Sequence, residues 1–131
     1  MPSPCSRLLP LLALMFACAT PTAPDVLGVW GGPDASLSLS RTGGVLSYAC
    51  GAGTMDANWT LSRDGQLAGT GQHFFGGGPV PPGGRAPHPA RYSGRIEDDT
   101  LFLTVTLTDL GQTLGRFTML RGGPQVHEVC V

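Results

Sequence analysis

The sequence predicts a small all-β domain, most simply an antiparallel up-and-down β-barrel of about eight strands. Short apolar runs that alternate with polar residues recur along most of the chain, and turn residues separate them. Glycines inside several of these runs permit the sharp bends that a closing sheet needs. No window longer than ten residues combines a helical period with a cap. A two-sheet β-sandwich is the alternative, because it uses the same alternation.

The expected strands follow one another with short turns. The clearest is 100–108, in which the leucine and valine side chains from Leu101 to Leu107 point one way and the threonines the other. Asp64-Gly65 lies between two runs and is a strong hairpin signal. The full set of expected strands is 26–30, 36–41, 45–50, 58–63, 67–75, 90–97, 100–108, 113–121 and 125–131.

Closure of the sheet is indicated by glycines inside these strands, namely Gly69, Gly71, Gly94 and Gly115. Sequential hairpins form a meander, and a meander that closes on itself is a barrel. Closure also removes the unpaired edges that a small exported sheet would otherwise expose.

Residues 1–18 have the features of an export signal. Arg7 precedes an apolar run from Leu8 to Phe16, and small residues follow it. The run is shorter than the roughly 20 residues that a helix needs to cross a bilayer. Because several prolines interrupt this segment, a buried helix is a poor interpretation. We therefore expect export, with 26–131 as the exported domain.

Two cleavage patterns overlap at the end of this signal. Residues 15–18 resemble the lipobox of bacterial lipoproteins, in which a small residue precedes the Cys that becomes lipidated. Cys18 would then carry a lipid anchor, and 19–25 would form a stiff Pro/Thr tether to the membrane. The alternative is an A-x-A site over 17–19, which would remove Cys18 and leave a secreted or periplasmic soluble protein.

Cysteine usage agrees with export in either case. Cys5 leaves with the signal and Cys18 is lipidated or removed, so Cys50 and Cys130 remain. An even pair in an oxidising compartment, outside any C-x-x-C spacing, predicts a structural disulfide. The bond would close a loop of about 80 residues and contribute about 4 kcal/mol on the chain-entropy model.

Charge and motifs argue against several classes of function. From residue 18 onward the chain has seven Arg and nine Asp or Glu, with no Lys and no basic run. We therefore expect no nucleic-acid partner. Catalytic and nucleotide-binding motifs are absent, and the acids at 97–99 fall at an expected turn, where water solvates them. We expect no enzyme activity and no cofactor.

The three histidines lack the spacing of a zinc site. His73 and His88 flank a loop and could approach each other if the loop doubled back, whereas His127 lies near the C-terminus. We expect solvated or hydrogen-bonded loop histidines and no metal.

Aromatic residues on most expected strands could fill the barrel or line a cavity. A barrel of about eight strands has room either for packed side chains or for one small ligand, and the many large apolar residues favour a filled core. If there is a ligand site, we expect Tyr48, Trp59 and Tyr92 to line it, with Phe74 and Phe75 at its mouth.

The longest segment without a strand pattern is 76–89, which has five Gly and five Pro among 14 residues. Loops beyond about 12 residues without structure of their own are usually functional or disordered. A lid or partner-binding flap and an extended surface connection both remain open.

Several segments from Gly28 to the end resemble a family of small exported bacterial proteins that are often lipoproteins. They are "GVWGG", "LSYACGAGTM", "DGQLAGTG", "TLFLTVTLTD" and "GRFTMLRGG". In general style they are similar to calycin-type barrels, whose early G-x-W corresponds to 28–30 here. The resemblance implies a barrel and carries no activity.

A second resemblance is to the membrane-bound inhibitors of c-type lysozyme, small lipoprotein barrels with an early Y-x-C and a partner Cys near the end. Residues 48–50 and Cys130 match that pattern, and 90–94 is similar to a segment of their inhibitory face. Those inhibitors direct a Lys toward the lysozyme active site, and this chain has none.

The sequence thus predicts an exported, lipid-anchored envelope protein that acts by binding and not by catalysis. The first hypothesis is a small-molecule or lipid ligand in the barrel mouth. The alternative is a protein-interaction module of the envelope, including a lysozyme-inhibitor-like one, that uses the face around 74–95.

Overall fold

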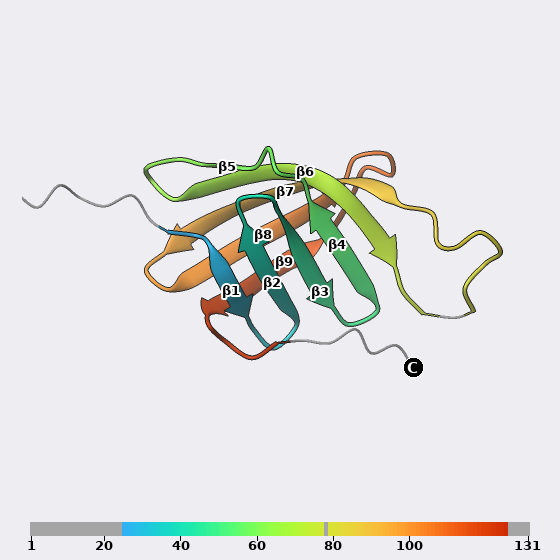
Figure 1. The fold of residues 1–131 in the computed structure, drawn as a ribbon, viewed down its shortest axis with the longest axis horizontal. Coiled ribbons are helices and arrows are strands. Elements are labelled where there is room, and N and C mark those ends of the chain that lie inside the picture. Colours follow the sequence, from blue (N-terminus) through green and yellow to red (C-terminus); the bar gives the residue numbers. More distant parts are fainter. Residues whose placement is uncertain (1–24, 78, 126–131) are drawn as a thin grey trace, which may run out of the picture.

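The computed structural model describes residues 25–77 and 79–125, which fold into nine antiparallel strands without a helix (Figure 1). The strands, each with its bounds, are β1 (Gly28–Gly31), β2 (Ala35–Ser40), β3 (Gly43–Tyr48), β4 (Gly51–Met55), β5 (Thr60–Leu61), β6 (Gln66–Phe75), β7 (His88–Glu97), β8 (Thr100–Leu107) and β9 (Gln112–Arg121).

Eight of these strands form a closed barrel. Each pairs with its neighbour in the chain, except that β4 pairs with β6 and β9 returns to β1. The short β5 is an extra strand on β6: it pairs with the first part of β6, and β4 pairs with the last part. The predicted up-and-down barrel is therefore confirmed, and the β-sandwich alternative is wrong.

Eight of the nine strands in the structure were predicted from the sequence, and one, β4, was not. β4 was not expected, because "GAGTM" has no alternation of large apolar and polar residues. The long loop is also shorter than expected, since β7 already begins at His88.

Several expectations concern residues outside the described part of the chain. These are the signal over 1–18, Cys18, nearly all of the tether, the strand over 125–131 and Cys130. The lipid anchor and the Cys50–Cys130 disulfide therefore stay predictions.

The barrel interior is filled by side chains from all eight wall strands. β6 contributes Leu67 and His73, and the other inward positions near the middle of β6 are glycines. Trp30 and Tyr92 are the largest fully buried residues of the interior, and Leu37, Leu46, Leu101, Leu103, Val105, Leu107 and Met119 pack around them. The Tyr92 hydroxyl crosses toward β4 and β6 and donates a hydrogen bond to the Gln72 carbonyl at 2.9 Å. Gly53 makes room for it: a Cβ at this position would lie 2.3 Å from the Tyr92 hydroxyl oxygen.

The seam between β1 and β9 is the shortest in the barrel wall. Only Trp30 with Arg121 and Gly31 with Leu120 are in register there. The Arg121 guanidinium lies 4.4 Å from the centre of the Trp30 ring. It also donates to the Asp99 carboxylate at 3.1 Å and to the Asp25 carbonyl at 2.6 Å. One side chain thus ties both seam strands to the β7–β8 turn.

The two ends of the barrel differ. One end, which we call the mouth, carries the turns 32–34, 49–50 and 108–111 together with the long loop 76–87, drawn in yellow in Figure 1. The opposite end carries the β2–β3 and β7–β8 turns and the excursion that contains β5.

We expect Gly53→Ala to lower the free energy of unfolding by about 2 kcal/mol, the usual cost of overpacking a filled core. The added methyl group collides with the Tyr92 hydroxyl, so in a Tyr92→Phe background the same change should cost less than half as much. Urea denaturation of the four proteins of this double-mutant cycle measures both values. An equal cost in both backgrounds would contradict the contact.

Candidate functional site

A hollow of about 370 Å³ opens at the mouth of the barrel. Its wall comes from three strands and two turns, and it is lined by Pro33, Asp34, Tyr48, Ala49, Cys50, His73, Phe75, Leu114 and Phe117. No described residue of the long loop belongs to this lining.

The floor of the hollow is a hydrogen-bonded pair, Tyr48 and His73. Tyr48 is the last residue of β3, and His73 points inward from β6, in phase with the buried Leu67. The Tyr48 hydroxyl forms a hydrogen bond with His73 Nδ1 and lies 3.3 Å from Nε2. The two rings are nearly parallel, with centres 5.5 Å apart.

Burial sets the protonation of this pair. His73 is fully buried, and the loss of solvent, followed by the charge on His88, lowers the pKa of His73. Burial, with Tyr92 as a smaller cause, raises the pKa of Tyr48. At neutral pH the hollow therefore presents a neutral imidazole and a protonated phenol.

Two phenylalanines enclose the pair. The Phe117 ring stacks on Tyr48 with centres 5.2 Å apart. The Phe75 ring meets His73 edge-on at 4.6 Å and His88 at 5.2 Å. Polar groups that can bind a ligand thus sit between aromatic surfaces, the arrangement typical of small-molecule sites.

A second histidine, His88, lies beside the hollow, against the Phe75 ring. His88 pairs in register with His73 across β6 and β7, and its Nδ1 lies 2.8 Å from the Asp109 carboxylate. Neither histidine is a loop residue, so that expectation is wrong, although both are hydrogen-bonded as expected. Within residues 25–77 and 79–125, no group of three or more His, Cys, Asp or Glu side chains is placed to hold a metal.

The structure brings together only two of the five aromatic residues expected at a ligand site. Tyr48 and Phe75 line the mouth. Phe74 is half-buried on the outer face of β6. Trp59 lies at the opposite end of the barrel, where its indole N–H donates to the Ser40 carbonyl at 2.9 Å. Tyr92 is a core residue of the barrel interior, and it also lines the second hollow described below.

Sequence reasoning missed His73, Phe117 and Leu114 as residues of the hollow. The signal for His73 was available, because Leu67, Gly69, Gly71, His73 and Phe75 share one strand phase. Phe117 and Leu114 were harder to place, because a bulge between Val105 and Thr106 shifts the register of β9 between them. Gly115 adopts φ +145° in this stretch, which only glycine adopts readily.

The long loop is tied at its base. Arg85 donates to the carbonyls of Phe75 and Gly77 at 3.2 Å and 2.9 Å. Together with the absence of loop residues from the lining of the hollow, this agrees better with a surface connection than with a lid.

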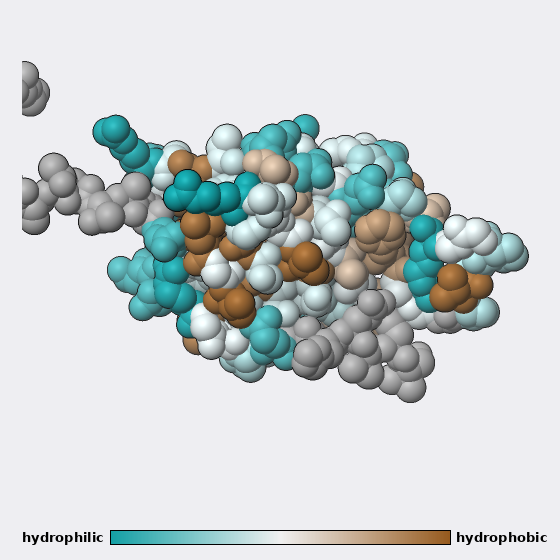
Figure 2. All heavy atoms as spheres, in the orientation of Figure 1, coloured by the Kyte–Doolittle hydropathy of each residue, from teal (hydrophilic) through white to brown (hydrophobic). Residues whose placement is uncertain are grey.

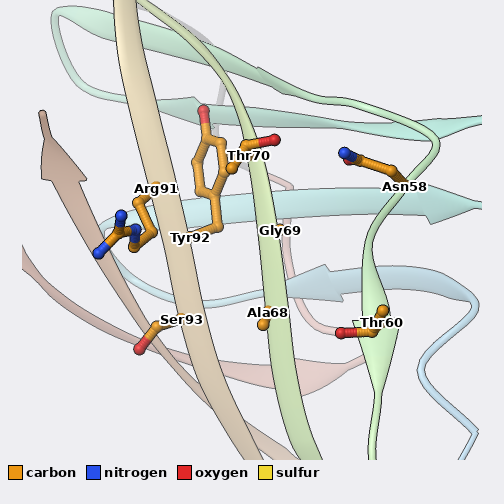
Figure 3. A pocket seen from close by; sticks show the side chains of 8 residues that line it. All are labelled: Asn58, Thr60, Ala68, Gly69, Thr70, Arg91, Tyr92 and Ser93. Atoms are coloured by element: carbon orange, nitrogen blue, oxygen red, sulfur yellow. The ribbon is translucent and has the colours of Figure 1, made fainter.

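A second hollow, of about 280 Å³, lies on the outside of the barrel (Figure 3). Its floor is the 68–70 segment of β6, Asn58 and Thr60 bound it on one side, and Arg91 and Ser93 stand on β7 at the other. It shares no residue with the mouth.

Comparisons with family models, curated proteins and solved structures give no match to this chain. Among the described residues there is no helix long and apolar enough to cross a membrane.

We expect acid to weaken the fold through His73. Because its folded pKa is lowered, the unfolded chain binds a proton below about pH 6.5 that the folded chain does not. The stability due to neutral His73 is therefore complete above that pH and is lost as the pH falls, by at most about 1.4 kcal/mol per pH unit.

Urea denaturation between pH 7.5 and 5 tests this expectation. The free energy of unfolding should fall less steeply in His73→Gln than in the wild type, and His88→Gln should keep most of the wild-type slope. An NMR titration of the wild-type imidazole gives the pKa directly. A His73 value at or above 6.5 would contradict the assignment.

Proposed function

We propose that the mouth of the barrel binds a small, mostly apolar molecule, and that the protein acts by binding and not by catalysis. The observation that carries this proposal is the Tyr48–His73 pair at the floor of an aromatic hollow, in a barrel that is otherwise filled. A polar pair of this kind is costly to bury and is a poor choice for filling a core.

The lining indicates the chemistry of the ligand. A volume of about 370 Å³ is at the lower end of small-molecule sites and suits one compact molecule. The Tyr48, Phe75 and Phe117 rings favour a planar ring system or a short acyl chain. One polar group on the ligand, such as a hydroxyl or carbonyl, would bond to the Tyr48–His73 pair at the floor.

Protonation supports binding over catalysis. A tyrosine with a raised pKa stays protonated at neutral pH and is a weak nucleophile or base. Its hydroxyl hydrogen-bonds to His73 and stays in place as a donor or acceptor for a ligand.

The proposed setting is the bacterial envelope, with the domain held at the membrane by lipid on Cys18 or, in the alternative, released as a soluble protein. A protein that only binds and carries a ligand needs no partner protein in the envelope. The other expectation, a protein-interaction surface over 74–95, draws less support. Phe74 and Phe75 point to opposite sides of the barrel wall, so they do not form one exposed patch.

We expect N-phenyl-1-naphthylamine, a neutral aromatic fluorophore, to bind the mouth with an increase in fluorescence. Phe75→Ala should raise its Kd about tenfold, which corresponds to about 1.4 kcal/mol of lost ring contact. Phe74→Ala removes the adjacent ring from the outer face and should leave the Kd within twofold.

Fluorescence titration of the three proteins gives these constants, and native mass spectrometry of protein purified from its host looks for a bound natural ligand. Equal effects of the two substitutions would place the probe elsewhere. Absence of both probe binding and a ligand adduct would refute the proposal.

A further inference from the structure

Charge is unevenly distributed over the outer surface of the barrel wall. The face over β1 to β4, in the foreground of Figure 2, has white and brown residues at its centre. Its outward positions on β2 to β4 that reach solvent carry no charge and are Ser38, Ser40, Val45, Ser47, Ala52 and Thr54. On β7 to β9 the outward positions instead carry three arginines, with Glu97 as the acidic residue.

Two of these arginines are free to bind a ligand. Arg95 pairs with Glu97 at 3.1 Å and lies over the Phe102 ring. Arg91 and Arg116 are exposed, and neither forms an ion pair with another residue in the part of the chain that the structure describes.

Hydroxyl groups connect these two arginines. The register of β5 to β9 aligns outward side chains in two adjacent cross-strand rows. One row is Thr60, Ala68, Ser93, Thr104 and Arg116, and the other is Thr70, Arg91, Thr106 and Thr113. We call these two rows the polar track.

The polar track crosses five strands, so it is about 19 Å long at the usual strand spacing. The outer hollow of about 280 Å³ lies at its β5 end. In Figure 3 the Arg91 side chain extends from β7 on the side away from β6, along the track. The two rows contain no carboxylate.

We propose that the polar track binds a segment of an acidic polysaccharide. Serine and threonine hydroxyls can donate to and accept from sugar hydroxyls, and unpaired guanidinium groups hold sulfate, phosphate or carboxylate groups through paired N–H bonds. Because the track crosses several neighbouring strands of the barrel wall, it suits an extended polymer that can follow the wall, whereas a compact molecule would occupy only the hollow. This site is independent of the one at the mouth.

Binding at this surface depends on salt. Arg91 and Arg116 are exposed, so their attraction for an anion is screened over about 10 Å at 0.1 M salt. We expect the affinity to fall as sodium chloride is raised from 50 to 500 mM.

Isothermal titration calorimetry with a heparin-derived hexasaccharide, an oligogalacturonide and neutral maltohexaose tests the proposal. The sulfated or the carboxylated oligosaccharide should bind the wild type, and the neutral one should bind at least tenfold more weakly. Arg91→Gln/Arg116→Gln should raise the Kd at least tenfold. The matched control, Arg41→Gln/Arg63→Gln, changes net charge equally at turns outside the track and should stay within twofold.

Other outcomes overturn the proposal. Equal losses of affinity in both double variants would indicate diffuse charge attraction. If maltohexaose bound as tightly as the acidic oligosaccharides, the arginines would play no part in recognition. Binding to phosphatidylglycerol vesicles but to neither acidic oligosaccharide would assign the face to the membrane. Phe75→Ala should leave oligosaccharide binding unchanged. A negative result here would therefore not count against the ligand site at the mouth, and a negative result there would not count against the polar track.

Discussion

The pairing of β4 with β6 is the constraint on which the rest of the structure depends. It bypasses β5, closes the sheet at eight strands and sets the register of Gly51 with Phe75 and of Gly53 with His73. Because Tyr48 pairs with Gly51 on the other side of β4, the same register brings the Tyr48 ring within reach of His73. Both the closed core and the polar pair at the mouth follow from one strand-to-strand contact.

The interior is filled where the wall is complete and hollow where it is not. β1 covers only the end of β9 near Arg121, so no described strand pairs with the β1-facing edge of β9 over 112–119. Leu114 and Phe117 lie on this stretch and line the hollow. Deeper in the barrel, glycines face large side chains, as Gly53 faces Tyr92.

The sequence predicts this fold well because strand alternation is a local signal. In the run from Leu101 to Leu107 the sequence alone predicts which face is buried. The structure buries all four inward residues, the three leucines and Val105. β4 is different: its inward positions are mostly glycines, whose role appears only when the rings that they accommodate are known. The residues that line the mouth were predictable only in part, because whether a residue lines the mouth depends on the end of the barrel that it lies at. Tyr48 and Trp59 look alike as strand aromatics, yet they lie at opposite ends.

Period-two alternation also lets one strand serve two separate surfaces. Tyr92 and Phe75 point inward, whereas their neighbours Arg91 and Phe74 point outward. The proposed mouth site and the proposed polar track therefore share strands but no side chains. Substitutions that alter one surface leave the other in place, as long as the inward residues that fill the barrel are kept. A small barrel can in this way hold a compact apolar molecule at its end and an extended polar one along its wall.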